Sequence, residues 1–208
     1  MKSERRMDIN EMALSHMEQK YGEKFEHAAQ YGNSMTGTRE FLATCKSLPG
    51  QHVLVQIENY TGDDRIFRDN YIAVKYLQDT IDFLHDCAVK VFGEANVYYV
   101  VNIDGLSPEL SATAAFDEYL ADDRVPLVIL IEAKESSYSG EEQITEIAGH
   151  ISSKVSKFLL TMVIVDDASY GSYDRDSLYQ QVSLRRFVHC ARINKLDNGI
   201  QVEWLAKE

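Results

Sequence analysis

The longest helical pattern in the chain lies between residues 69 and 93. Apolar positions recur there at spacings of three and four, which places them on one stripe of a helix. Asp69 is a suitable N-cap, and Gly93 can adopt the left-handed conformation that ends a helix. We therefore predict a helix from about Asp69, preceded by a short strand near residues 65–68. The stripe consists of Tyr71, Val74, Leu77, Ile81, Leu84, Ala88 and Val91.

Three later segments have the composition of strands and alternate with helical patterns. Residues 97–103 are rich in β-branched and aromatic side chains, and residues 127–132 and 158–165 are continuous apolar runs. A helix around residues 113–121 precedes the second segment, and a helix carrying Ile144, Ile147 and Ile151 precedes the third. Such alternation is typical of parallel strands joined by crossover helices. We expect all three segments in one central sheet.

The two ends of the chain carry antiparallel signals. Asp8 and Glu11 form a capping box for a first helix that ends near Gly22. Strand patterns at residues 40–47 and 53–58 are joined by Pro49-Gly50, and Asp197-Asn198-Gly199 joins residues 188–196 to 200–205 as a hairpin. The predicted fold class is α+β, with a mixed sheet, an antiparallel N-terminal part and strand–helix alternation in the C-terminal half.

The length of 208 residues suits a single compact domain of residues 1–208 and can bury a sizeable core. Two smaller lobes, of about residues 1–104 and 105–208, are the alternative. No stretch rich in Pro or Ser marks a linker between them.

Charge and hydropathy exclude several classes of partner. The formal net charge of -12 repels phosphate backbones, so we predict no nucleic-acid partner. No apolar run approaches the ~20 residues that span a bilayer, so we predict no transmembrane segment. The N-terminal residues lack the apolar part of a signal peptide, and three widely spaced cysteines fit reduced thiols. These features predict a cytoplasmic protein.

Catalytic and cofactor motifs are missing from the sequence. It contains no glycine-rich phosphate loop and no nucleophile elbow, so we predict no cofactor and name no catalytic residue. Glu146 and His150 stand one helical turn apart and could chelate a metal. No third ligand is identifiable, and a solvated Glu–His pair explains their spacing equally simply. We therefore predict no metal site.

The best candidate for binding is the loop that follows residues 158–165. It carries Asp166, Asp167, Tyr170 and Tyr173, which we predict to bind a ligand. In open α/β sheets, ligands bind beyond the carboxyl ends of strands, and tyrosines offer contact area at low entropic cost. The alternative is an ordinary surface loop whose tyrosines lie on the core.

Two functional classes remain open. The first, which we favour, is a non-catalytic module that binds a protein partner or a small polar ligand, cationic or neutral because the surrounding acids oppose anions. The second is a hydrolase-like enzyme whose site is assembled from distant residues such as Glu146, His150 and Asp166, because catalytic groups are brought together in space and not in sequence.

Three segments resemble one group of proteins. They are Thr44-Cys45-Lys46-Ser47-Leu48-Pro49-Gly50, the run from Phe67 to Tyr76 (FRDNYIAVKY) and the run from Glu118 to Asp122 (EYLAD). They resemble segments of uncharacterised small proteins of Gram-positive gut bacteria, some of which look like lipoproteins. The resemblance covers nearly the whole chain. The resemblance implies an extracytoplasmic lipoprotein as the alternative location, if an N-terminal leader had been removed. It implies no activity and no catalytic residues.

Overall fold

The computed structural model describes residues 8–33, 37–101, 110, 113–124 and 126–206. The chain forms two compact units, which are Met1–Lys75 with Ile103–Ala115, and Tyr76–Asn102 with Phe116–Glu208. The first contains an antiparallel sheet and the second a mixed sheet, so the predicted α+β class is confirmed. The single domain of residues 1–208 stays a prediction.

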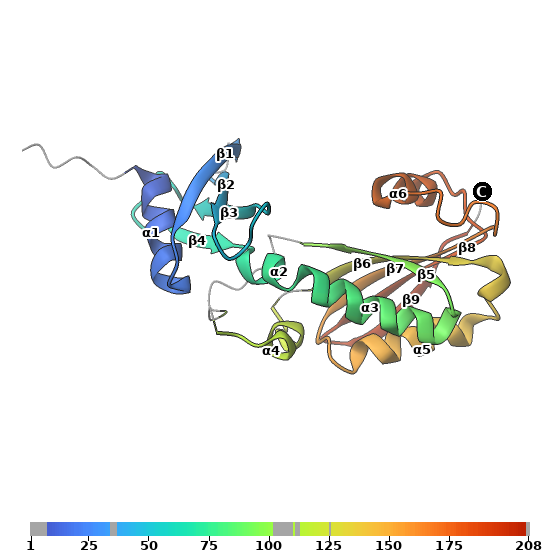
Figure 1. Cartoon of the computed structure of the whole chain (residues 1–208). Coiled ribbons are helices and arrows are strands. Elements are labelled where there is room, and N and C mark those ends of the chain that lie inside the picture. Colours follow the sequence, from blue (N-terminus) through green and yellow to red (C-terminus); the bar gives the residue numbers. More distant parts are fainter. Residues whose placement is uncertain (1–7, 34–36, 102–109, 111–112, 125, 207–208) are drawn as a thin grey trace, which may run out of the picture. The chain divides into compact units, whose positions relative to one another are not determined.

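The first unit is a four-stranded antiparallel sheet with a helix at each end of its sequence (Figure 1). The predicted capping box at Asp8 and Glu11 is present, and Gly22 ends the first helix with φ 71°. The strands pair in sequence order, as the Pro-Gly turn predicted. The elements are α1 (Ile9–Tyr21), β1 (Phe25–Asn33), β2 (Arg39–Cys45), β3 (Val53–Glu58), β4 (Ile66–Asp69) and α2 (Tyr71–Lys75).

The core of the first unit lies on one face of this sheet. Phe41 pairs with Val55 and Ala43 pairs with Val53, so these four side chains share a face, and all are fully buried. Helix α1 packs against β1 and buries Met17. The alternation of apolar and polar positions in β2 and β3 therefore specifies which face the helix covers.

The prediction of one long helix from Asp69 is wrong in one respect, because the helix is divided at Tyr76. Helix α2 ends at Lys75, and α3 (Leu77–Phe92) begins a residue after Tyr76 in the second unit. Asp69 still caps α2, since its Oδ1 accepts the Tyr71 backbone N–H at 3.0 Å. A break of one residue leaves the spacing of apolar positions almost unchanged, so periodicity alone could not reveal it.

The second unit contains the predicted central sheet. Its strand order is β5-β6-β7-β8-β9, so the three segments expected together are adjacent. Residues 102 and 103 of the first predicted strand lie outside the described residues. The remaining elements are β5 (Ala95–Val100), α4 (Phe116–Ala121), β6 (Leu127–Lys134), the 3₁₀ turn Glu135–Ser137, α5 (Glu141–Ser152), β7 (Phe158–Val165), α6 (Arg175–Ser183), β8 (His189–Leu196) and β9 (Gly199–Trp204).

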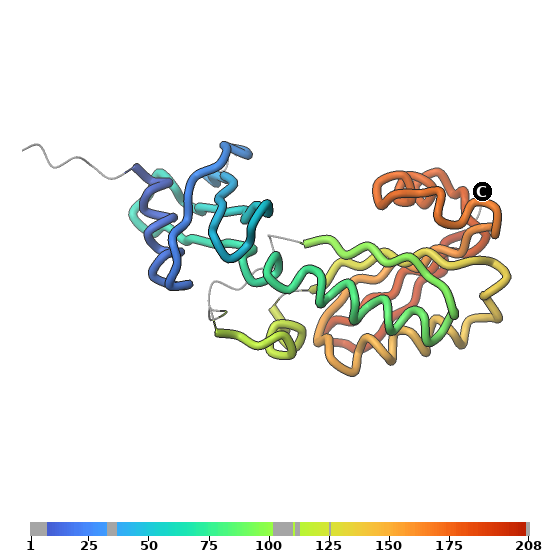
Figure 2. The backbone as a smooth tube through the Cα atoms, viewed as in Figure 1, coloured from blue at the N-terminus to red at the C-terminus, as the bar shows by residue number. Residues whose placement is uncertain are grey.

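Only part of the expected parallel alternation is present. Strands β6 and β7 are parallel and joined by α5, which carries the chain back along the sheet (Figure 2). Strands β5 and β6, and β7 and β8, are antiparallel, which corrects the prediction. The segment containing α6 is an excursion and not a crossover: the Val188 N–H bonds the Ile164 carbonyl at 2.7 Å, so β8 starts where β7 ends.

The mixed sheet is covered on both faces. Helices α3 and α5 lie side by side on one face, where Ile129, Ile131 and Leu160 are buried (Figure 1). Helix α6 lies on the other face, over a cluster that includes Leu130 and Val163. Burial on both faces explains why β6 and β7 read as continuous apolar runs.

Candidate functional site

The segment from Asp166 to Asp174, here the 166–174 loop, leaves β7 at the carboxyl end of the parallel pair. Asp166 accepts the backbone N–H of Ser169 at 3.0 Å on Oδ1 and the Ser169 hydroxyl at 2.7 Å on Oδ2. Asp167 accepts the backbone N–H of Ser136 at 3.0 Å, which ties the loop to the turn after β6. The bonds from Ser169 and Ser136 lower the pKa of each carboxyl, so both are ionised near neutral pH.

The two predicted tyrosines are half-buried and rest on the core beneath α6. Tyr170 and Tyr173 both pack against the apolar cluster on that face. The Tyr98 hydroxyl donates to the Tyr173 carbonyl at 2.8 Å, and the Lys134 Nζ lies 4.7 Å from the centre of the Tyr170 ring. Both residues therefore help to hold the loop on the sheet.

Glu132 is a second anchor that sequence reasoning missed. It lies in β6, is fully buried, and accepts a hydrogen bond from the Asn96 side chain at 2.8 Å. Both of its carboxylate oxygens also lie 3.3 Å from the Gly171 N–H. Gly171 has φ 73°, a conformation that favours glycine. The sequence offered one signal for Glu132, since it is a single acidic residue inside an otherwise apolar run. A carboxylate buried in such a strand almost always has a hydrogen-bond partner.

A cavity of about 340 Å³ opens at the base of the loop, and we call it the β7-end cavity. Of the four predicted site residues, Asp166 and Tyr173 line it, whereas Asp167 and Tyr170 do not contribute to its lining. Its lining combines an aspartate, an arginine, a glutamine and a tyrosine with apolar residues. The lining residues are Val165, Asp166, Tyr173, Gln181, Arg186, Phe187 and Val188.

The turn after α6 positions two of the lining residues that the sequence did not reveal. Arg185 adopts a left-handed backbone conformation with φ 57°, which costs a non-glycine residue roughly 1–2 kcal/mol. The next N–H, of Arg186, bonds the Gln181 carbonyl at 2.9 Å. This turn brings Arg186 and Phe187 back towards β8. A strained turn has no signature in the residue types of Arg185-Arg186, so neither residue could be selected from sequence.

The residues considered for metal binding or catalysis remain separate. Glu146 and His150 contact each other on α5, with His150 Nε2 3.7 Å from Glu146 Oε1, and both side chains are exposed. Asp166 follows β7 and bonds Ser169. Across the described residues, no three His, Cys, Asp or Glu side chains gather as a metal site would require.

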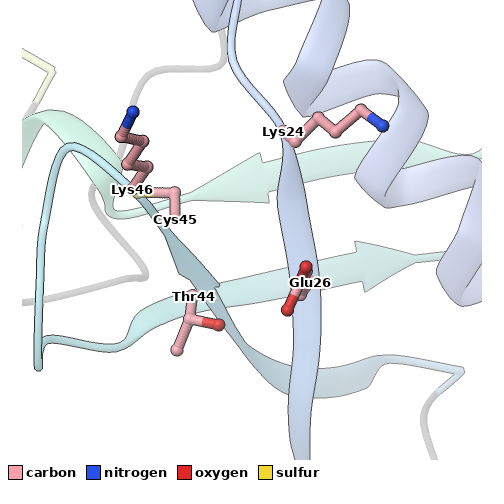
Figure 3. A pocket seen from close by; sticks show the side chains of 5 residues that line it. All are labelled: Lys24, Glu26, Thr44, Cys45 and Lys46. Carbon is pink, nitrogen blue, oxygen red and sulfur yellow. The ribbon is translucent and has the colours of Figure 1, made fainter.

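The first unit carries a second cavity, of about 310 Å³, between β1 and β2 (Figure 3). Lys24, Glu26, Thr44, Cys45 and Lys46 line it. Figure 3 shows that the ammonium groups of Lys24 and Lys46 point away from each other, so their charges do not converge on one anion. Glu26 adds the opposite charge, and the cavity forms no anion site.

A serine beside this cavity is held by a carboxylate. Glu23 accepts the Ser47 hydroxyl at 2.5 Å and the Tyr71 hydroxyl at 2.6 Å. Burial raises the pKa of Glu23, but these hydrogen bonds outweigh burial and lower it below its ordinary value. Such a weak base does not activate a serine for nucleophilic attack. We interpret the trio as a structural tie between the start of β1 and the turn after β2.

Comparisons with known proteins add one similarity in shape. No protein-family model matches the chain, and no curated protein matches it. Among solved structures, a DUF5037 family protein from Ruminococcus gnavus is similar, with 11% identity, coverage of 77% of this chain and 76% of that chain, and a TM-score of 0.39. That protein comes from a gut bacterium, the source that the sequence resemblance indicated. A similarity at this TM-score carries no argument about function.

The described part of the chain contains no helix with the length and apolar character that a membrane span needs.

Proposed function

We propose that the protein is a non-catalytic binding module and that the β7-end cavity is its ligand site. The supporting observation is that an aspartate, an arginine and two aromatic residues line one cavity, namely Asp166, Arg186, Tyr173 and Phe187. Its volume of about 340 Å³ falls in the range of small-molecule sites, which pair apolar walls with few polar groups.

The lining favours a small neutral ligand that carries a cationic and an anionic group. Asp166 is exposed and ionised, so its carboxylate can interact with an ammonium group while it holds Ser169. Arg186 can bind a carboxylate with two parallel hydrogen bonds. The net charge of -12 opposes simple anions. This proposal narrows the cationic or neutral polar ligand predicted from sequence.

The walls of the cavity are fixed before any ligand arrives. Asp174 caps α6, and its Oδ1 accepts the Ser177 N–H at 2.8 Å. The Tyr98 hydroxyl holds the Tyr173 carbonyl, and Ser169 holds Asp166. A site on rigid elements loses less conformational entropy on binding, which favours affinity.

The experiment is a thermal-shift and calorimetric screen with free amino acids, betaines and amino sugars. With the first ligand found, Tyr173→Ala and Arg186→Gln should each weaken binding at least tenfold, about 1.4 kcal/mol. Asp167→Asn is the matched control, because Asp167 lies in the same loop outside the cavity lining. Far-ultraviolet circular dichroism verifies that each variant is folded.

Two results would contradict the proposal. One is a screen in which no zwitterionic compound binds. The other is a ligand whose affinity stays unchanged in both cavity variants, which would move the site elsewhere and leave the 166–174 loop as an ordinary surface.

The widely spaced cysteines also support a cytoplasmic location, and the net charge of -12 supports the exclusion of nucleic acid as a ligand. Both belong to this proposal, with the lipoprotein location as its alternative.

A further inference from the structure

Strand β9 is an edge strand whose six residues are all exposed. Ile200, Val202 and Trp204 retain 44%, 41% and 36% of their accessible surface. They alternate along the strand, so they share one face of the sheet. Their partners on β8 include Ile193 and Ala191, which are buried. Strand β9 therefore continues the apolar face of the sheet beyond the part that is covered.

The backbone of the same three residues faces the open edge. The Leu205 N–H bonds the Cys190 carbonyl at 2.9 Å, in register with the β8–β9 ladder. In an antiparallel ladder, alternate residues turn their N–H and C=O groups towards the partner strand. The residues that bond β8 are therefore the odd-numbered ones. Ile200, Val202 and Trp204 direct their backbone groups away from β8.

The other edges have features that oppose strand addition. Strand β1 has register shifts between His27 and Ala29 and between Gln30 and Gly32. Strand β4 has four residues, and its Arg68 bonds Glu58 at 2.6 Å. Strand β5 is buried or half-buried throughout. Bulges, short length and charge protect natural sheet edges, yet β9 (GIQVEW) contains no lysine and no proline.

We propose that β9 pairs antiparallel with β9 of a second copy of this chain, centred on Val202. In this register, Val202 faces Val202 of the other copy, and Ile200 faces Trp204. Each of these pairs exchanges two backbone hydrogen bonds, because all three residues direct their groups outwards. Their side chains form one apolar strip across the two-fold axis. The mixed sheet then continues from one copy into the next.

The charged residues on and near β9 favour this register and allow a second copy of the chain to bind there. Centring on Val202 places Gln201 opposite Glu203, whereas a shift that centred on Glu203 would oppose two carboxylates. Glu203 lies opposite Arg192 in the β8–β9 ladder, and Asp197 lies 2.7 Å from Lys157, so both acidic residues have a basic neighbour. The net charge of -12 opposes pairing of two copies, and salt with a screening length of ~8 Å at physiological strength weakens this repulsion.

A single strand from each copy makes a small interface compared with the ~1,600 Å² of a typical stable complex. The dimer is therefore weak and concentration-dependent. It tightens as salt screens the repulsion between the two acidic chains.

The first experiment is analytical ultracentrifugation of the full chain over a range of concentrations. We expect a monomer–dimer equilibrium, with Trp204, the only tryptophan, changing its emission as the dimer forms. Val202→Lys should be monomeric, because a central lysine blocks edge pairing. Leu184→Lys is the matched control, since Leu184 is 50% exposed at the end of α6, and it should dimerise normally.

The second experiment tests the register. At low salt, Gln201→Lys should tighten the dimer roughly two- to fivefold by facing Glu203 of the other copy, and Gln201→Glu should weaken it similarly. A wild-type chain that stays monomeric at every concentration, or one that dimerises unchanged with Val202→Lys, would overturn the proposal. A monomer whose Trp204 emission responds to an extended peptide would instead assign the edge to a peptide partner.

Discussion

At the scale of single residues, Glu132 shows how a buried carboxyl group can hold a surface loop in place. Its carboxylate accepts from Asn96 on β5 and from the Gly171 N–H, so it joins a neighbouring strand to the 166–174 loop. Removing it takes this acceptor away from the half-buried Asn96 side chain and from the Gly171 N–H. We expect Glu132→Ala to lower the free energy of unfolding by roughly 1–3 kcal/mol, because two hydrogen bonds are lost and each typically contributes about 0.5–1.5 kcal/mol.

Urea denaturation followed by Trp204 fluorescence measures this change. Glu146→Ala is the control, because Glu146 is an exposed glutamate on α5 and should change the midpoint little. Equal midpoints for Glu132→Ala and the wild type would show that Glu132 does not hold the loop.

A buried tyrosine pair makes the second unit sensitive to alkali. The hydroxyls of Tyr99 and Tyr119 lie 2.5 Å apart, and burial raises the pKa of Tyr99 to about 12 and raises that of Tyr119 as well. An unfolded tyrosine titrates near 10. Because the folded state holds these protons more tightly, their contribution to stability is complete below about pH 10 and is lost as the pH rises through about 12.

Unfolding free energies measured in urea between neutral pH and pH 12 test this prediction. The double variant Tyr99→Phe, Tyr119→Phe removes both polar groups together, so it should be nearly neutral at pH 7. Its stability should also fall less steeply above pH 10. An identical alkaline slope in the double variant and the wild type would contradict the assignment.

The residues of the β7-end cavity differ in how visible they were in the sequence. Asp166 follows an apolar strand directly and Tyr173 lies in the loop that begins there, so the rule that ligands bind beyond strand ends selected both. Gln181 reaches the cavity from α6, and Arg186 follows a left-handed residue. Their positions depend on how α6 folds back over the sheet, and that depends on tertiary packing.

At the scale of elements, the strands and caps were predicted best. Strand β7 matches its predicted bounds, and the predicted cap at Asp8 is present. Ser139 and Glu142 have the sequence spacing of a capping box, but that expectation is wrong: α5 begins after Gly140, and the Ser139 N–H bonds the Gln143 side chain. Strand direction was harder to predict, since antiparallel and parallel neighbours can both be joined through a helix.

Asp174 should carry a measurable part of the stability of α6. It forms a capping box with Ser177, and that helix covers the apolar cluster beside the cavity. We expect Asp174→Ala to lower stability by about 1 kcal/mol, as loss of an N-cap typically does. Asp176→Ala is the control, because Asp176 lies in the first turn and pairs only with its exposed neighbour Arg175 among the contacts described. A thermal melt that ranks the two variants equally would argue against the cap.

At the scale of the whole molecule, the division into two compact units runs through the most regular pattern in the sequence. Tyr71 and Val74 belong to the first unit, whereas Leu84 and Ala88 belong to the second. The prediction of one helix from their stripe therefore joined residues that are buried in two different cores. The fold class was accessible because it depends on element types, but the unit boundary depends on long-range contacts that one sequence does not display.

Two cores predict two separable unfolding steps. Phe41 is fully buried in the first unit and Leu84 in the second. Truncating a buried residue of this size to alanine destabilises its own core by roughly 2–5 kcal/mol. Trp204 reports on the second unit alone, whereas far-ultraviolet circular dichroism reports on both. We expect Leu84→Ala to shift the fluorescence transition to lower urea concentration. We expect Phe41→Ala to leave the fluorescence transition unchanged and to shift only the dichroism change that comes from the first unit. Coincidence of the two probes is the standard test for a single cooperative transition. If both variants moved both probes together, the two units would unfold as one body.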